Sequence, residues 1–371
     1  MTIQKSPDME AMMRPELLKL EEYTPVEPLD RLSKRLGIPV EQIVKLDANE
    51  NPYGSSPAAL EALKRQQYYH IYPDPSSLNL REELEKYTGI NKERIFVGSG
   101  SDELLELLTR LFIVPGDNIL NFVPTFGMYS FLGELYRAQI RKVPRHANDY
   151  SIDVKAGLAA IDERTKLIFV CTPNNPTGNS APESVVRALL DTGKIVVVDE
   201  AYHDFAGHSF IKLTNIYENL VVLRTFSKLS GLAGLRVGYG IVPEAIARQL
   251  WKIKQPYNVT VAGQEAARAS LSEGTWISEH IQKIVAERER LYGLLQQFSD
   301  HFEALPSSSN FIFCRMKKGR AKQIKNELEK RGVLVRHYNK PLLENAFRVS
   351  VGRPEQTDIF IEHLKQIIYT Q

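Results

Sequence analysis

Short apolar runs alternate with amphipathic helical segments between about residues 46 and 242. The runs are rich in valine, isoleucine and other strand formers, and polar turns separate them from the helical segments. They lie at residues 94–97, 118–123, 166–171, 194–199, 220–225 and 237–242. Strands that alternate with helices are typical of an α/β fold with a mainly parallel sheet between helical layers. We therefore predict a large α/β domain over residues 46–245.

The pattern changes on either side of this region. After Pro256 it predicts two long helices, at 261–272 and 276–298, followed by apolar runs that predict strands. This order indicates a small α+β domain, which we place at residues 246–371. The first 45 residues show little periodicity and contain three prolines between Pro15 and Pro28. We expect them to form an arm and part of the small domain.

Composition restricts the partners of the chain. Of its 371 residues, 47 are lysine or arginine and 45 are aspartate or glutamate, so no large net field favours nucleic acid or a membrane surface. The two cysteines, Cys171 and Cys314, form neither a disulfide framework nor a metal-binding pattern. No apolar run approaches the ~20 residues of a membrane span, and residues 1–13 lack the apolar core of a signal peptide. We expect a cytoplasmic protein that binds small molecules and no metal.

Polar side chains follow three successive predicted strands. Asn175 comes after the run at 166–171, Asp199 and Tyr202 after the next, and Ser227 and Lys228 after the third. Ligands of open α/β sheets bind outside the carboxyl ends of the strands. These residues therefore predict a binding site at one edge of the sheet.

Lys228 is the first candidate for covalent chemistry. It leaves an apolar strand and enters a turn of small residues, where loss of water lowers the lysine pKa and favours the nucleophilic amine. Eight residues later, Arg236 offers a forked cation that suits a phosphate. The pair predicts an aldehyde cofactor that carries a phosphate, pyridoxal 5′-phosphate. The alternative interpretation of Lys228 is a solvated loop residue.

Asp199, Asn175 and Tyr202 have matching roles toward such a cofactor. Asp199 closes a run of three valines, and a buried carboxylate needs a cation or donor, which a protonated pyridine nitrogen would provide. Asn175 and Tyr202 could donate to the phenolic oxygen of the ring. The alternatives are a helix cap for Asp199 and a simple turn for the segment that contains Asn175.

The remaining candidates could bind the phosphate or the ring of the cofactor. Ser101 and Asp102 begin a predicted helix after a Gly-Ser turn, where free amides suit an anion that Ser227 and Arg236 would share. Phe126 follows another strand and could stack on the ring. The alternatives are a plainly capped helix and a core phenylalanine.

Ten motifs in order give the chain a family resemblance. They are LEEYTP, LDANENPYG, YPDP with SLNLREELEKYTG, GSGSDELL, PTFGMYS, TPNNPTG, VVVDEAYHDF, RTFSKLSGLAGLRVGYG, KQPYNV and FRVSVG. The chain thereby resembles the fold-type I pyridoxal-phosphate aminotransferases, and among them the histidinol-phosphate aminotransferase family. The resemblance spans nearly the whole length and implies a seven-stranded, mainly parallel sheet.

The resemblance also implies roles for the residues collected above. Lys228 would hold the cofactor as a Schiff base, Asp199 would pair with the pyridine nitrogen, and Asn175 and Tyr202 would contact the phenolic oxygen. Phe126 would stack on the ring, in a place that tyrosine often fills in the family. The phosphate would be bound by Ser101, Asp102, Ser227 and Arg236.

Further expectations rest on the resemblance alone. The family is homodimeric with shared active sites, and Tyr53 would reach the cofactor phosphate of the neighbouring subunit. The substrate would be bound by Tyr23, Arg336 and Arg348, with Asn51 and Tyr257 lining the pocket. An exposed turn tyrosine and a structural ion pair are the alternatives for Tyr53 and Arg348. The arm reads YTPVEP where the family commonly has a glycine after the first proline, which affects the surroundings of Tyr23.

The reaction implied is transamination between L-histidinol phosphate and 2-oxoglutarate, giving imidazole acetol phosphate and L-glutamate in histidine biosynthesis. Two alternatives share the scaffold, an aromatic amino acid aminotransferase and a phosphothreonine-type decarboxylase. A ligand sensor of the same fold would be a different class of protein.

Overall fold

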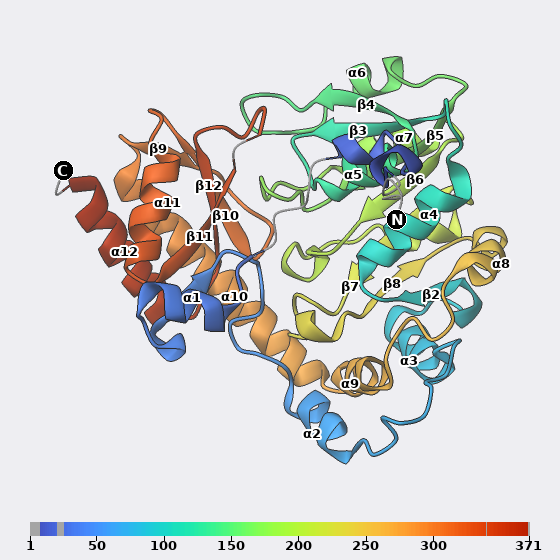
Figure 1. Cartoon of the computed structure of the whole chain (residues 1–371), viewed down its shortest axis with the longest axis horizontal. Coiled ribbons are helices and arrows are strands. Elements are labelled where there is room, and N and C mark those ends of the chain that lie inside the picture. The colour runs from blue at the N-terminus through green and yellow to red at the C-terminus, as the bar shows by residue number, and fades with distance from the viewer. Residues whose placement is uncertain (1–7, 21–25, 339, 370–371) are drawn as a thin grey trace, which may run out of the picture.

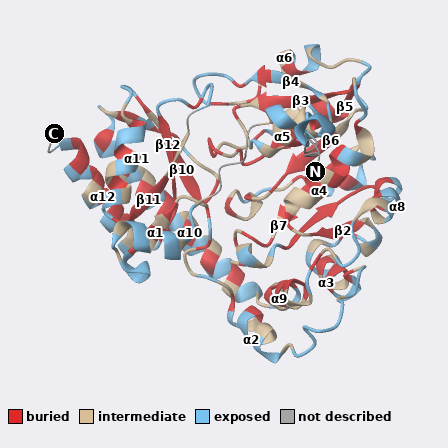
Figure 2. Ribbon diagram, in the orientation of Figure 1, coloured by how far each residue is buried: buried red, intermediate tan, exposed pale blue. Residues whose placement is uncertain are grey.

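Two β-sheets organise the computed structural model, which describes residues 8–20, 26–338 and 340–369 (Figure 1). A long helix, α10 (Gly274–Leu295), runs from the larger layered region to the smaller one. The buried residues follow the strands of both sheets, whereas most helices turn an exposed face outward (Figure 2).

The larger sheet has seven strands in the order β2-β8-β7-β6-β5-β3-β4. The five strands from β7 to β4 are parallel, while β8 pairs antiparallel with both β7 and β2. The bounds are β2 (Ile95–Gly98), β3 (Asn118–Val123), β4 (Gln139–Pro144), β5 (Thr165–Cys171), β6 (Ile195–Asp199), β7 (Leu220–Thr225) and β8 (Gly238–Ile241). The predicted seven-stranded, mainly parallel sheet is confirmed.

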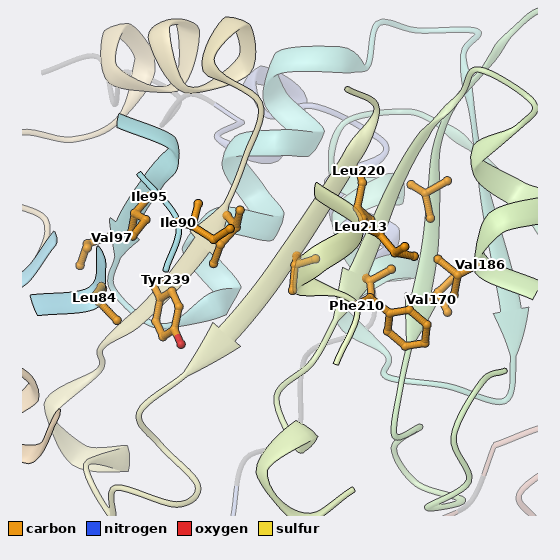
Figure 3. Close-up of a cluster of buried hydrophobic side chains, with 14 of the residues drawn as sticks. Leu84, Ile90, Ile95, Val97, Val170, Val186, Phe210, Leu213, Leu220 and Tyr239 are labelled. Atoms are coloured by element: carbon orange, nitrogen blue, oxygen red, sulfur yellow. The ribbon is translucent and has the colours of Figure 1, made fainter. Parts of the chain in front are cut away.

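Helices cover both faces of this sheet. One face packs against α4 (Ser101–Phe112), α5 (Met128–Leu135) and α8 (Glu244–Ile253). The other packs against α2 (Pro57–Arg65), α3 (Leu78–Thr88), α6 (Val154–Ala159), α7 (Glu183–Leu190) and α9 (Val261–Leu271). Figure 3 shows part of this second interface, where Val170 of β5 meets Val186 of α7.

The smaller sheet has the order β1-β11-β12-β10-β9. Its strands are β1 (Val44–Leu46), β9 (Phe302–Ala304), β10 (Phe311–Met316), β11 (Val333–Tyr338) and β12 (Ala346–Ser350). Only β1 and β11 are parallel. Helices α10, α11 (Ala321–Lys330) and α12 (Pro354–Tyr369) bury apolar residues against it, and α1 (Leu29–Leu36) packs beside β11.

Side-chain alternation along β6 determines where its last residue points. Val196 and Val198 belong to the core on the α7 side, whereas Val197 belongs to the core on the α5 side. Because successive strand residues face opposite sides, Asp199 shares the side of Val197. The carboxylate therefore points toward the α4 and α5 layer.

The residue bounds of the predicted domains stay a prediction. The expected boundary at 245 places α8 and α9 with the small domain, but α8 packs on α4 and α9 packs on α2 and α3. By this packing the small domain would begin later, near α10. Within the described ranges, no helix is both long and apolar enough to cross a bilayer.

Candidate active site

Lys228 follows β7 and lies in a buried turn. Its Nζ donates to the carbonyl of Ala48 at 3.4 Å and lies 5.6 Å from the centre of the Tyr202 ring. Burial lowers the pKa of the lysine to about 8, and the positive charge of Arg348 adds to this effect. A substantial fraction of the amine is therefore neutral near physiological pH, as a nucleophile requires.

Asp199 ends the neighbouring strand β6 and is only 3% exposed. Its Oδ2 accepts a hydrogen bond of 2.7 Å from the Tyr129 hydroxyl, and its Oδ1 accepts one of 3.0 Å from the Ala201 amide. Burial raises the pKa of Asp199 to about 6, against the opposing effect of these hydrogen bonds. None of the ion pairs between described residues includes this carboxylate. It is a buried acid suited to a cationic ligand group.

Tyr129 is a site residue that the sequence did not reveal. It lies on α5, is fully buried, and stacks on Phe169 at 4.8 Å with an interplanar angle of 3°. Phe126 meets its ring edge-on at 5.6 Å. The alternation along β6 carried a usable signal, because it directs Asp199 toward the helix that contains Tyr129.

Tyr202 is brought to the lysine as predicted. It is buried, and its ring meets Phe311 of β10 edge-on at 5.1 Å. Its hydroxyl oxygen accepts a hydrogen bond of 3.0 Å from the amide of Asn49, a residue that the motifs did not single out. Burial raises the pKa of Tyr202 well above its usual range, so the hydroxyl stays protonated.

Asn175 and Arg348 meet at the boundary between the two sheets. Arg348, on β12, is 5% exposed and donates from Nη1 to Asn175 Oδ1 at 2.6 Å and from Nη2 to the Asp47 carbonyl at 2.7 Å. Its Nε is buried without a hydrogen-bond partner in the structure. Arg336 lies directly opposite Arg348 in the pairing of β11 with β12. Two guanidinium groups on neighbouring strand positions repel each other and favour an anion between or beside them.

Three of the four predicted phosphate ligands, Ser101, Asp102 and Arg236, lie at the start of α4, and Ser227 follows β7, whose end pairs with β8 beside it. Arg236 donates to the Asp102 carboxylate at 3.0 Å, and both side chains are about half exposed. Ser227 is buried and hydrogen-bonded through its hydroxyl to Thr225 at 2.9 Å. The helix begins at Ser101 with its free amides toward this cluster.

Two glycines keep the cluster open to a ligand. A Cβ on Gly100, which has φ +77°, would lie 2.5 Å from Arg236 Nη2. A Cβ on Gly238 would lie 2.4 Å from the backbone nitrogen of Ser101. Side chains at these positions would occupy the cradle, so the residues fit a bound phosphate.

The segment from Asp47 to Ser55, which we call the bridging loop, joins the lysine turn to the smaller sheet. Asn51 Nδ2 donates to the Leu229 carbonyl at 2.5 Å, so Asn51 contacts the lysine turn. The Tyr53 ring lies against His280, at 5.0 Å, and beneath Arg353, at 5.4 Å. These contacts place the Tyr53 ring beside α10 and the residues that follow β12.

The last two candidates are Tyr257 and Tyr23. Tyr257 is 42% exposed and stacks on Tyr72 at 4.5 Å, and its place in the substrate pocket stays a prediction. Its sequence position after KQP gave no information on this partner. Tyr23 lies outside the described residues.

This arrangement combines the nucleophilic amine of Lys228, the buried acid Asp199, the Tyr202 hydroxyl, the Asn175 amide and a phosphate cradle. The amine can attack a carbonyl and can then carry a proton. The acid can hold a cationic ring nitrogen, and the paired arginines can bind an anionic substrate.

Comparisons with known proteins agree with this chemistry. The aminotransferase class I and II family model matches residues 41–364. A histidinol-phosphate aminotransferase of Roseiflexus castenholzii is 47% identical over 365 residues, which are 96% of this chain and 98% of the relative. The chloroplastic histidinol-phosphate aminotransferase 1 of Arabidopsis thaliana is 46% identical and aligns with 96% of this chain and 86% of its own.

A solved structure supports the same fold. Histidinol-phosphate aminotransferase from Sinorhizobium meliloti, in complex with pyridoxal 5′-phosphate, superposes with a TM-score of 0.87 at 25% identity. The match covers 96% of this chain and 98% of that chain. The likeness therefore includes both sheets.

Proposed function

The chain belongs to the class I and II aminotransferases, and from this premise we propose that it transfers the amino group of L-histidinol phosphate to 2-oxoglutarate. The products are imidazole acetol phosphate and L-glutamate, and the reaction is a step of histidine biosynthesis. The observation that carries the proposal is the buried Lys228 amine beside the buried Asp199 carboxylate at adjacent strand ends. Histidinol phosphate is the substrate that we propose because histidinol-phosphate aminotransferases are 46–47% identical over 96% of this chain.

Pyridoxal 5′-phosphate supplies an aldehyde that condenses with amines and a protonated pyridine ring that withdraws electrons. The chain would hold its phosphate at the start of α4 and its ring nitrogen at Asp199. The partly buried Phe126 would cover the ring. The carboxylate of Asp102 repels a phosphate, so we assign it the task of holding Arg236 in place while its backbone amide binds.

Lys228 would act first as a nucleophile and then as a proton carrier. Its pKa near 8 leaves the amine partly neutral at pH 7, so Nζ can bind the cofactor aldehyde. With cofactor and substrate bound, the freed Nζ of Lys228 would serve as the base that accepts a proton and as the acid that returns it. Such positioned acid–base catalysis contributes typically 100-fold or more.

Asp199, Asn175 and Tyr202 would set the electronic state of the cofactor. An ionised Asp199 stabilises a positive charge on the ring nitrogen, and this charge draws electrons from the reacting carbon. Tyr202 remains a hydrogen-bond donor because burial keeps it protonated. Asn175 accepts from Arg348 through Oδ1, so its amide nitrogen is left to donate.

The substrate site would consist of Arg336, Arg348 and the arm residue Tyr23. Two facing arginines and a tyrosine can hold a phosphate monoester, and Arg348 can take the carboxylate of 2-oxoglutarate in the second half of the cycle. Its unpartnered Nε provides a donor for that purpose. Asn51 would support the site through the lysine turn.

We propose a homodimer in which Tyr53 reaches the cofactor phosphate of the partner subunit. The support is the resemblance of the NENPYG segment to the family; within its own chain the Tyr53 ring packs on His280 and Arg353. Tyr257 with Tyr72 would then line the dimer rather than a pocket within one chain. A cytoplasmic location stays a prediction.

A substrate panel tests the function. Protein loaded with pyridoxal 5′-phosphate and 2-oxoglutarate is supplied with histidinol phosphate, phenylalanine or phosphothreonine. We expect kcat/KM for histidinol phosphate to exceed that for phenylalanine by roughly 100-fold, since phenylalanine lacks the phosphate, whose charged hydrogen bonds contribute about 2–3 kcal/mol. Absence of glutamate formation from histidinol phosphate would refute the proposal, and decarboxylation of phosphothreonine would favour the rival reaction.

Two further measurements locate the chemistry. Borohydride reduction followed by peptide mapping should place the phosphopyridoxyl group on Lys228. Arg348→Lys should lower kcat/KM for histidinol phosphate at least tenfold, because a lysine ammonium cannot form the paired hydrogen bonds of a guanidinium group. Arg315→Lys on the neighbouring strand β10, where the arginine pairs with Glu303 at the surface, is the matched control and should have no effect.

A further inference from the structure

Asn49 is a buried residue whose polar groups are all engaged. It is 1% exposed, lies in the bridging loop and has φ 55°, a left-handed conformation that asparagine tolerates better than most residues. Its backbone amide donates to Ser350 Oγ at 2.9 Å, and its carbonyl accepts from Asn310 Nδ2 at 3.0 Å. Both partners belong to the small-sheet side of the molecule.

The side chain of Asn49 joins Ser350 to Tyr202. Its Oδ1 accepts from the Ser350 hydroxyl at 2.9 Å, and its Nδ2 donates to the Tyr202 oxygen at 3.0 Å. The hydroxyl of Ser350 has one proton, and it already accepts the amide of Asn49, so this proton is available for Oδ1. Ser350 is 2% exposed.

This pattern determines the orientation of the amide. With the amide reversed, the buried Ser350 proton would lose its acceptor, at a cost of about 1–3 kcal/mol. Tyr202 would then have to donate its own proton to Asn49. The observed orientation instead directs an N–H at the Tyr202 oxygen.

This orientation leaves the hydroxyl proton of Tyr202 without an acceptor among the described residues. In the part of the chain that the structure describes, the Tyr202 hydroxyl receives a hydrogen bond but donates to no protein acceptor. Its ring is fixed by Phe311 on one side and by the neighbourhood of Lys228 on the other. The proton is therefore reserved for a ligand beside the lysine.

We propose that Asn49, held by Ser350, is a positioning residue that directs the Tyr202 proton toward the phenolic oxygen of the cofactor. This proposal rests on the proposed function, in which Tyr202 contacts that oxygen. It also gives the small sheet a direct influence on the cofactor, because Ser350 ends β12. Movement of β12 relative to the larger sheet changes the hydrogen bond that the cofactor receives.

The substitution Asn49→Asp tests the idea with almost no change of shape. A carboxylate offers only acceptors, so it captures the Tyr202 proton and removes the hydrogen bond to the phenolic oxygen. That bond stabilises negative charge on the phenolic oxygen. Without it, the negative oxygen attracts a proton more strongly to the nitrogen that joins the cofactor to Lys228. Loss of the bond should raise the pKa of this nitrogen by about one unit, the equivalent of one hydrogen bond.

The readout is a pH titration of the visible absorbance of the protein loaded with pyridoxal 5′-phosphate. Asn49→Asp and Tyr202→Phe should each raise the transition by about one unit, and the double variant should move no further than Tyr202→Phe. Ser350→Ala should shift it less, in the same direction, and remains informative if Asn49→Asp does not fold. Asn121→Asp is the matched control, because Asn121 is also buried and donates from Nδ2 to a hydroxyl, that of Ser130, at 3.0 Å.

The outcomes separate this proposal from the function itself. A shift in Tyr202→Phe without one in Asn49→Asp or Ser350→Ala overturns the role of Asn49 and leaves the function intact. Additive shifts in the double variant also overturn it, since Asn49 would then act independently of Tyr202. No shift in Tyr202→Phe also overturns the role of Asn49, because Tyr202 then makes no contact with the phenolic oxygen, whereas the function is tested separately by the substrate panel.

Discussion

At the residue scale, the site consists of groups whose burial opposes their charge. Burial raises the pKa of Asp199 to about 6 and lowers that of Lys228 to about 8. Both shifts favour the neutral form, so the charged forms cost folding free energy that the protein without cofactor does not recover. Bound cofactor would offset the cost at Asp199 by placing a cation there.

The first prediction concerns this cost at Asp199. An acid whose pKa is higher in the folded state stabilises the protein fully below the unfolded value of 3.8 and loses that contribution as pH rises through about 6. Asp199→Asn cannot ionise, so the stability of the cofactor-free variant relative to wild type should increase between pH 4 and 7, by at most about 3 kcal/mol. Thermal unfolding of both proteins across this range measures it. Asp300→Asn, at an exposed position, should show no such trend.

Tyr129 gives the second prediction, because its hydroxyl is a donor that keeps Asp199 ionised. The hydrogen bond lowers the pKa of the carboxyl, so Tyr129→Phe should raise it further and move the acid limb of the kcat/KM profile to higher pH. We expect kcat/KM on the acid side of the profile to fall about tenfold, the effect of one hydrogen bond to a charged group. Tyr136→Phe removes a hydroxyl that donates to Glu106, also at 2.7 Å, at a distance from the site. An equal profile shift in both variants would contradict the role of Tyr129.

At the element scale, the bridging loop and the lysine turn are two backbone segments in close contact. Ser55 Oγ donates to the Gly231 carbonyl at 2.8 Å, and Asn51 donates to Leu229 nearby. A Cβ on Gly231 would lie 2.2 Å from the Gly54 carbonyl oxygen. The contact therefore requires glycine in the lysine turn.

The third prediction follows from this contact. Gly231→Ala should separate the two segments and strain a residue with φ +65°, so affinity for pyridoxal 5′-phosphate should fall at least tenfold. Gly234→Ala is three residues away and has nothing within 4 Å of the added Cβ. Fluorescence titration of the cofactor-free proteins compares them. Equal affinities in the two variants would show that the close approach does not hold the lysine.

The sequence predicts elements better than it predicts contacts between them. β6 and Asp199 were predictable because three valines and a polar end form a local pattern. Strand β1 was not predictable from the sequence. Its three residues pair in parallel with β11, almost 290 positions later, and such a short strand with a distant partner leaves no periodic signal. Asn49 and Tyr129 were missed for a related reason, because their partners come from other elements. The resemblance assigned Tyr257 to the pocket, which stays a prediction, and gave no sign of its stacking partner Tyr72.

At the scale of the whole molecule, the active site lies between the two sheets and is contributed by both. Arg348 of the small sheet contacts Asn175 of the large one, and Arg353 donates to the Pro52 carbonyl of the bridging loop at 2.8 Å. Relative movement of the two layers would therefore alter the substrate cations and the bridging loop together. Closure of this kind would exclude water while Lys228 moves the proton.

The fourth prediction tests whether two copies share each site. In a symmetric dimer that combines Lys228 of one subunit with Tyr53 of the other, a hybrid of Lys228→Ala and Tyr53→Phe subunits has one site with both residues intact. Random reassociation of an equal mixture makes half of the dimers hybrids, so about a quarter of all sites should regain wild-type turnover. Each variant unfolded and refolded alone, with the same total protein, provides the control. If both residues of a site came from one chain, every hybrid would carry one defect in each site, and mixing would restore no activity beyond the mean of the two parents.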